Sequence, residues 1–451
     1  MVLRTCGFSE CSEPAERSIG SCMLCGKHLC RKHKEGSSHR CPSADSDADV
    51  YFDAYSAAKK KHLAALLAKI QVGALEAAAT RARRGIPCRI PVFPSGVDHD
   101  FRLDIVSRQC GGQKCHLDVL FDDGVEWIAR IRLEDSLLPP QPVQDHIFLS
   151  EVATLQFHQP ASPENPVGTS YILLEKMKGK PLDWNRATPE RRSRILEQLA
   201  DLYLEMEKHP LPMTGSLVLA DPPGLVGGFA QQPWFAAPEG PTGPFMSLKA
   251  AYESIVHQQM QAISNHEITS LPVDNYITFP WRLSVVPALA SSSASSLGPF
   301  YLKHYDDKGD HILVDEEYNI TGVIGWEFAS AEAKELAFSS PCMIWPVGDF
   351  YAGSNRPAPE ELEFSRILQG RGRDDLSQCV LDGRRWQRFT FSLGGGVPSV
   401  RTELESLFRG LQSCFANGEK DVASYEIWKE SAMNTFIQND KQLETLLADE
   451  N

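Results

Sequence analysis

Cysteine and histidine side chains crowd the first 41 residues, and this feature constrains the fold more than any other. Six of the chain's 12 cysteines and three of its 13 histidines lie there, and all of them except His28 follow the pattern C-x4-C-x10-C-x2-C-x4-C-x2-H-x5-H-x-C. A segment this short cannot bury a core of its own, and thiolate and imidazole groups at such spacings are typical zinc ligands. Eight ligands fill two tetrahedral sites, so we predict two structural zinc ions. The predicted ligands are Cys6, Cys11, Cys22, Cys25, Cys30, His33, His39 and Cys41.

The spacing resembles that of the AN-one-type zinc finger, in which alternate ligand pairs share a metal ion. The resemblance implies one site made of Cys6, Cys11, Cys30 and His33, and another made of Cys22, Cys25, His39 and Cys41. One departure is the first gap of four residues, where the family usually has two. Because no coordination position is left open for water, we expect the module to recognise a protein partner and not to catalyse a reaction.

A second informative stretch, residues 300–327, reads FYLKHYDDKGDHILVDEEYNITGVIGWE. Residues 312–314 and 320–324 are short apolar runs separated by polar turn residues, which predicts a β-hairpin. A charged loop with His304, Asp306 and Asp310 precedes it. A loop that holds carboxylates beside a hairpin suits the binding of phosphate and metal ions.

This stretch resembles the catalytic segment of the aminoglycoside phosphotransferase and choline kinase families, which reads H-G-D-x-H-x-x-N-I-L-V-D followed by I-x-D-W-E. The matching residues are His304, Tyr305 and Asp306, the run from His311 to Asp315, and Ile324-Gly325-Trp326-Glu327. The resemblance implies that Asp306 is the carboxylate that orients and deprotonates the acceptor hydroxyl. ATP and Mg²⁺ are the cofactors that it implies.

Two positions of this chain depart from that pattern. His311 stands where the family has an Asn that helps to hold a second magnesium ion, and imidazole suits zinc, nickel or copper better than magnesium. Gly325 stands where the family has the Asp that bridges magnesium to the phosphates, and glycine offers no ligand. We therefore expect a metal site that is degenerate.

The residues upstream of this segment fit the same resemblance. Residues 51–84 are predicted to form one long amphipathic helix, which Gly85-Ile86-Pro87 ends, and residues 88–138 carry strand patterns with a turn at Asp123-Gly124. The resemblance implies that Arg130 reaches the phosphates and that Glu151 pairs with it. It also implies that Glu175 and Met177 belong to a hinge that holds adenine.

The predicted fold class is α+β, with a bilobal protein-kinase-like domain preceded by a small zinc-stabilised module. The predicted domains are the zinc module at residues 1–45, a helical connector at 46–84 and the kinase-like domain at 85–440. Within the last, the N-lobe would cover about 85–175 and the C-lobe about 178–440.

The net charge and the lack of long apolar runs argue against some classes of function. A net charge of -14 argues against a broad nucleic-acid interface. No apolar run is long enough to cross a membrane and the N-terminus has no secretory pattern, so we expect an intracellular protein, cytoplasmic or nuclear.

Two hypotheses about function follow from the sequence. In the first, the chain is an ATP-dependent phosphotransferase for a small hydroxylated substrate, impaired at Gly325. In the second, it is a non-catalytic pseudokinase scaffold whose zinc module recruits a protein partner.

Overall fold

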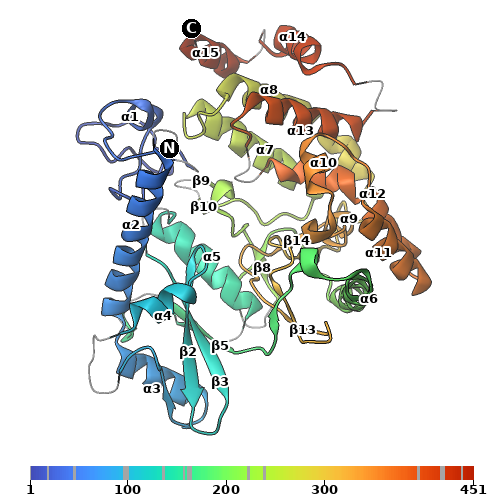
Figure 1. Cartoon of the computed structure of the whole chain (residues 1–451). Coiled ribbons are helices and arrows are strands. Elements are labelled where there is room, and N and C mark those ends of the chain that lie inside the picture. The colour runs from blue at the N-terminus through green and yellow to red at the C-terminus, as the bar shows by residue number, and fades with distance from the viewer. Residues whose placement is uncertain are drawn as a thin grey trace. The chain divides into compact units, whose positions relative to one another are not determined.

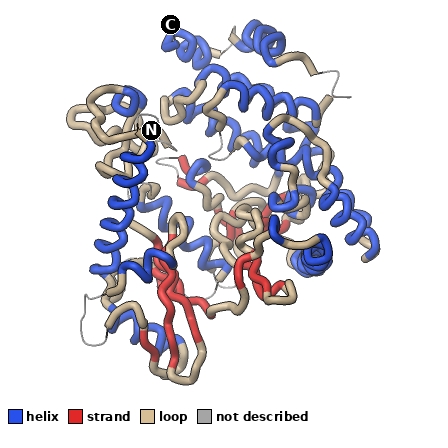
Figure 2. Tube along the Cα trace, in the orientation of Figure 1, coloured by secondary structure: helices blue, strands red, loops and turns tan. Residues whose placement is uncertain are grey.

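The structure is a computed structural model, and its fold class is α+β, as the sequence predicts (Figure 2). It describes residues 2–17, 20–43, 47–94, 101–134, 138–155, 158–159, 165–220, 224–236, 240–393, 397–416, 422–437 and 440–450. The chain divides into two compact units. The smaller comprises Arg4–Ala15 and Ile19–Met177, and the larger comprises Met1–Leu3, Glu16–Ser18 and Lys178–Asn451.

The smaller unit is built on a five-stranded antiparallel sheet in the order β1-β2-β3-β5-β4. Its strands are β1 Cys88–Arg89, β2 Lys114–Phe121, β3 Glu126–Arg132, β4 His158–Gln159 and β5 Tyr171–Glu175. Its helices are α1 Arg31–Glu35, α2 Ala48–Lys69, α3 Val72–Ala82, α4 Leu103–Arg108 and α5 Gln141–Thr154. The long β2–β3 hairpin is visible in Figure 1, and its turn contains Gly124 at a φ of 87°, which glycine adopts readily.

The two faces of this sheet carry different kinds of side chain. Alternate side chains of a strand point to opposite faces, so each strand contributes to both. Leu117 and Val119 of β2, with Ala129 and Ile131 of β3, join side chains of α2, α3 and α4 in one apolar core. The opposite face of the sheet carries Lys114, His116 and Arg130. Ile172 of β5 lies on the same face and packs against Phe148 and Val152 of α5. One face is therefore the hydrophobic core, and the other carries charge.

The prediction of one helix over residues 51–84 is wrong, because the chain forms α2 and α3 with a bend of 67° between them. Ile70 leaves the helical conformation, and the backbone N–H of Gln71 donates to the Val167 carbonyl at 3.0 Å. Gly168, at a φ of 86°, lets the backbone come close to the Lys69 carbonyl. The break is thus made by a contact with a distant loop. The domain boundary predicted at residues 45–46 lies outside the described residues.

Within the described ranges, no single helix has both the length and the apolar character needed to cross a membrane, and the bent α2–α3 pair meets that test only when both helices are counted together.

The larger unit is mainly helical. Its helices are α6 Pro189–Met206, α7 Leu248–Ser264, α8 Pro272–Ser291, α9 Lys334–Ala337, α10 Val347–Tyr351, α11 Pro359–Gly370, α12 Asp374–Phe391, α13 Arg401–Ser413, α14 Tyr425–Phe436 and α15 Lys441–Glu450. Helices α7 and α8 pack together (Figure 1). Among the fully buried side chains of the core that they share are Tyr276, Phe279 and Phe389.

Short strands complete the larger unit and position the segment singled out in the sequence. They are β6 Lys180–Pro181, β7 Ser216–Leu217, β8 Val226–Gly227, β9 Phe235–Ala236, β10 Gly240–Pro241, β11 Tyr301–Lys303, β12 Ile312–Val314, β13 Ile320–Val323 and β14 Ser330–Glu332. β12 and β13 form the predicted hairpin, and β6 adds a third strand. The Asp315 carboxylate closes the turn by accepting from the backbone N–H groups of Glu317 at 3.0 Å and Asn319 at 2.8 Å.

A buried ion pair secures the N-terminal residues that belong to the larger unit. The Arg17 Nε donates to Glu267 Oε2 at 2.8 Å and its Nη2 donates to Oε1 at 3.1 Å, so the contact is bidentate. The backbone N–H of Leu3 donates to the same carboxylate at 2.9 Å. The Glu267 side chain is fully buried and that of Arg17 is 10% exposed. Such a pair is expensive to break because the remaining charge stays buried without compensation.

We predict that Glu267→Ala lowers the free energy of unfolding of the larger unit by about 3–5 kcal/mol, because Arg17 is left without its carboxylate. Urea unfolding of the full chain measures this. The control is Glu253→Ala, which removes an exposed pair with Lys249 at 3.7 Å and should cost at most about 1 kcal/mol. Equal losses in the two variants would contradict the role given to the buried pair.

Candidate functional site

The eight predicted zinc ligands form two separate groups of four. Cys6, Cys11, Cys30 and His33 make one group, and Cys22, Cys25, His39 and Cys41 make the other. Within each group one ligand atom per residue lies within 4.8 Å of all the others. These are the quartets that the zinc-finger resemblance implies.

The distances within the quartets suit a zinc ion. A tetrahedron with bonds of about 2.3 Å has edges of roughly 3.8 Å. The Sγ of Cys30 lies 3.3 Å from Nδ1 of His33 and 3.9 Å from Sγ of Cys11. In the other quartet, Sγ of Cys25 lies 3.6 Å from Nε2 of His39. Each quartet could hold one zinc ion in a closed site.

Local structure brings these ligands together. Cys30 is the N-cap of α1, and the backbone N–H of His33 donates to its carbonyl at 3.1 Å, so the two ligands lie on one helical turn. The ring of Phe8 stacks on the His33 imidazole with centroids 4.2 Å apart. The imidazole is therefore held in place by packing as well as by the chain.

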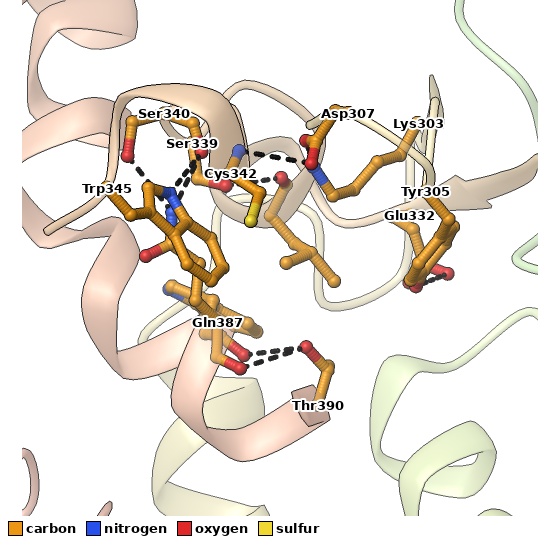
Figure 3. Close-up of polar contacts among 12 residues, drawn as sticks. Lys303, Tyr305, Asp307, Glu332, Ser339, Ser340, Cys342, Trp345, Gln387 and Thr390 are labelled. Atoms are coloured by element: carbon orange, nitrogen blue, oxygen red, sulfur yellow. Dashed lines mark hydrogen bonds and ion pairs between the residues drawn. The ribbon is translucent and has the colours of Figure 1, made fainter. Parts of the chain in front are cut away.

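In the larger unit, the loop before β12 is fixed by Asp307, which the sequence did not single out. One Asp307 carboxylate oxygen accepts from the backbone N–H of Cys342 at 3.0 Å and the other from Lys303 Nζ at 3.2 Å (Figure 3). The backbone N–H of Met343 donates to the Asp307 carbonyl at 3.0 Å. Asp307 and Lys303 are both buried. Asp307 therefore positions the loop from within.

Asp306, the predicted catalytic carboxylate, points away from this buried network. Its side chain is 55% exposed and lies 3.0 Å from Lys308 Nζ. The Asp310 carboxylate lies 3.9 Å from the same ammonium group. Asp306 is thus accessible, as a base for an external hydroxyl must be, while its neighbour anchors the loop.

His311, at the predicted metal position, stacks against His304. The rings of His304 and His311 have centroids 4.4 Å apart, and Trp326 packs edge-on against His304. His304 Nε2 donates to the Ile324 carbonyl at 2.8 Å, and His311 Nδ1 accepts from the backbone N–H of Gly309 at 3.3 Å. Burial is the main cause that lowers the pKa of both rings, to about 3 for His311, whose neighbour His304 lowers it further. Both imidazoles are neutral at pH 7.

Gly325 has a conformation that favours glycine, with a φ of 79°. A Cβ atom added there would meet His304 Nε2 at 3.9 Å, an ordinary contact, so there is room for a side chain. The exposed carboxylates of the loop before β12, Asp306 and Asp310, contact Lys308, and the Nδ1 of His311 already accepts a hydrogen bond. These residues do not fit a magnesium ion, which needs hard oxygen ligands in octahedral geometry.

In the smaller unit, a buried carboxylate binds two cations. Glu151 of α5 forms ion pairs with Arg130 of β3 and with Lys114 of β2, the latter at 2.7 Å. The Glu151 side chain is fully buried, and Lys114 is 8% exposed. The contact between Arg130 and Glu151 is the one that the kinase resemblance implies. Lys114 was not predicted from the sequence. Its position two residues before His116 in β2 places both side chains on the same face of the sheet, which is a signal that the sequence contains.

The pKa of His116 reflects the positive charge on this face of the sheet. It lies opposite Arg130 in the β2–β3 register. Burial is the main cause that lowers the pKa of His116 to about 4. The positive charges of Arg130 and Lys114 contribute to this lowering, and the negative charge of Asp118 opposes it more weakly. Lys114 and Arg130 thus concentrate positive charge around Glu151. The same positive charge suits the binding of anionic groups.

The predicted hinge residues lie where the chain passes from one unit to the other. Glu175 ends β5 and is exposed, Met177 is 42% exposed, and the division of the chain falls between Met177 and Lys178. Between them, the backbone N–H of Lys176 donates to the Glu126 carbonyl at 3.0 Å.

Comparisons with known proteins give structural similarities only. No family model matches the chain. No curated protein matches its sequence either.

Solved structures similar to the chain include aminoglycoside phosphotransferase APH(2'')-Ib with ADP bound, at 10% identity and a TM-score of 0.36, covering 68% of this chain and 92% of that one. Ethanolamine kinase from Plasmodium vivax matches at 12% identity and a TM-score of 0.34, covering 76% and 83%. Macrolide 2'-phosphotransferase MphH from Brachybacterium faecium matches at 15% identity and a TM-score of 0.33, covering 76% and 97%. At such TM-scores these similarities assign no activity to this chain.

We predict that His116 makes the smaller unit less stable as the pH falls from about 6.5 to about 4. In this window the unfolded chain binds a proton on His116 and the folded chain does not, so acid favours unfolding, by up to about 1.4 kcal/mol per pH unit. The measurement is the free energy of unfolding of wild type and His116→Gln across this range. Because other groups titrate equally in both proteins, the difference isolates His116, and a difference that does not change with pH would refute the prediction.

Proposed function

We propose that this protein is a zinc-containing relative of the small-molecule kinases that binds ATP but has lost the magnesium bridge on which efficient phosphoryl transfer depends. The observation that carries the proposal is Gly325, at the position where the motif of the phosphotransferase families has its metal-binding Asp. The neutral pair of His304 and His311 supports it, since neither ring offers magnesium a hard oxygen ligand.

Each remaining residue of the motif has a role in this proposal. Arg130, ordered by Glu151, would bind the phosphates, and Lys114 would add a second positive charge at the same carboxylate. Glu175 and Met177 would contact adenine. Asp306 would orient an acceptor hydroxyl, because its carboxylate is accessible. Loss of the metal bridge would remove several kcal/mol of charge stabilisation and slow transfer by orders of magnitude.

A second candidate function is a non-catalytic scaffold in which the N-terminal module recruits a protein partner. The four-ligand quartets favour it, since a closed zinc site serves structure and recognition. In this case the kinase-like residues would bind nucleotide without turning it over, or would serve only to support the fold.

We predict two zinc ions per chain. Bound zinc would supply on the order of 10 kcal/mol of folding free energy at each site, so removing one ligand should release one ion. Elemental analysis should return two zinc ions for wild type and for the control Cys88→Ser, whose thiol lies outside both quartets, but about one for Cys30→Ser or Cys41→Ser. One zinc ion or none in the wild type would refute the assignment.

We predict that Gly325→Asp makes ATP binding depend on magnesium, strengthening it about tenfold or more when magnesium is added, or roughly 1.4 kcal/mol. The introduced carboxylate would restore the bridge between metal and phosphates. Calorimetric titration with a non-hydrolysable ATP analogue, with magnesium or with EDTA, measures this. Asp306→Asn should leave binding unchanged, since Asp306 acts on the acceptor.

Gly325→Asn is the matched control, because it imposes a similar backbone strain at positive φ without the negative charge. Equal affinity with and without magnesium in a folded Gly325→Asp protein would show that this segment is not a kinase-like site. A gain of the same size in Gly325→Asn would show that the charge is not its cause.

A further inference from the structure

A small cavity lies within the helical part of the larger unit, and none of the predicted site residues lines it. Its lining residues belong to α8 and α13, together with Ser392, Val397 and Pro398 after α12. Its size leaves room for about one water-sized ligand. The apolar lining consists of Phe279, Val397, Pro398, Leu404, Leu407 and Phe408, and the polar lining of Asn275, Thr278, Arg282 and Ser392.

Arg282 brings a positive charge to this cavity without a carboxylate to balance it. The residue is 4% exposed. Its Nη1 donates to Thr278 Oγ1 at 3.0 Å and its guanidinium lies over the Phe279 ring at 5.4 Å, while its Nε is buried with no hydrogen-bond partner. Among the residues that the structure describes, no acidic side chain forms an ion pair with it.

Two other arginines of the same unit are buried, and they differ in how their charge is balanced. Arg388 donates only to uncharged oxygens, those of Asn355 and Ser354, whereas Arg384 has a carboxylate partner. Arg384 is as well buried, and it donates to both oxygens of Glu361, at 2.9 and 2.8 Å. Burial lowers the pKa of Arg282 to about 9, which still leaves the guanidinium protonated at neutral pH. Arg282 is thus a buried cation, and a buried charge without a counter-charge is strongly unfavourable.

The cavity lining has hydrogen-bond donors that no described residue uses, beside one amide acceptor, Asn275 Oδ1. The Asn275 amide nitrogen already donates to the Ser270 and Pro398 carbonyls, and the Thr278 hydroxyl donates to the Asn275 carbonyl. The Ser392 hydroxyl has no hydrogen-bond partner in the described part of the chain. The N–H of Arg282 Nε and the hydroxyl of Ser392 are therefore available to a ligand that accepts hydrogen bonds.

We propose that this cavity is a binding site for a small monovalent anion of the size of chloride, held by Arg282 with help from Ser392. The unbalanced guanidinium calls for a negative charge, and the available donors call for an acceptor. Because the space is small, chloride is the anion used to test the site. The anion would complete the core of the larger unit and stabilise it, since a ligand that binds only the folded state raises its stability.

The first test compares thermal unfolding of the full chain in sodium chloride and in sodium gluconate at equal ionic strength. Gluconate is too large to enter, so chloride should raise the midpoint by about 2–4 °C in the wild type. Arg282→Met should abolish this difference, and Ser392→Ala should reduce it. Arg366→Met, which removes an exposed arginine of α11, should retain it in full. Equal midpoints in the two salts for the wild type would overturn the proposal, as would a chloride effect that persists in Arg282→Met.

The second test uses the wild type alone and so does not depend on the folding of Arg282→Met. Crystals soaked in sodium bromide should give an anomalous-scattering peak within hydrogen-bond distance of the Nε of Arg282, because bromide substitutes for chloride and water does not scatter anomalously. A cavity that shows only an ordered water beside Arg282 would refute the anion site.

Discussion

The cost of burying charged side chains is the constraint on which the rest of this structure depends. Glu151 accepts from Lys114 and Arg130 inside the smaller unit, and so allows a sheet to carry cations on the face opposite its apolar core. In the larger unit Glu267 binds Arg17 in the same way. In each case the pair adds little net stability, but removing one partner is costly because the other charge remains buried. These pairs therefore fix which segments must lie together.

The same constraint applies to the segment that resembles the phosphotransferase motif. The Asp307 carboxylate is buried with Lys303 and accepts from the backbone of Cys342, so it holds the loop while the adjacent Asp306 stays exposed. At the two positions where the motif has metal ligands, the chain has the neutral His311, which stacks on His304, and a glycine. A metal ion bound there would have no carboxylate ligand at position 325 to balance its charge.

The parts of the fold that could be predicted from the sequence depend on contacts between near neighbours. The hairpin of β12 and β13 follows from two apolar runs with turn residues between them, and the α+β class follows from many such patterns. The eight zinc ligands follow from their spacing within one short segment, and their division into two quartets follows from the resemblance to the zinc finger.

What could not be predicted depends on residues far apart in the chain. The break between α2 and α3 has no proline or glycine in it, and it is set by a hydrogen bond from Gln71 to Val167. Lys114 resembles a surface residue of a strand, because its partner Glu151 lies on α5 and only the folded chain brings them together. Which residue of the Asp306-Asp307 pair is buried was likewise not evident from sequence, since it depends on Cys342.

The central claim is that the segment resembling the phosphotransferase motif lacks a magnesium bridge. The most direct measurement is the affinity of the wild-type protein for an ATP analogue in magnesium and in EDTA. The account predicts dissociation constants that agree within about twofold, because no carboxylate at position 325 links metal to phosphate. An affinity that rises about tenfold or more when magnesium is added would contradict it, since the chain would then hold the metal without that carboxylate.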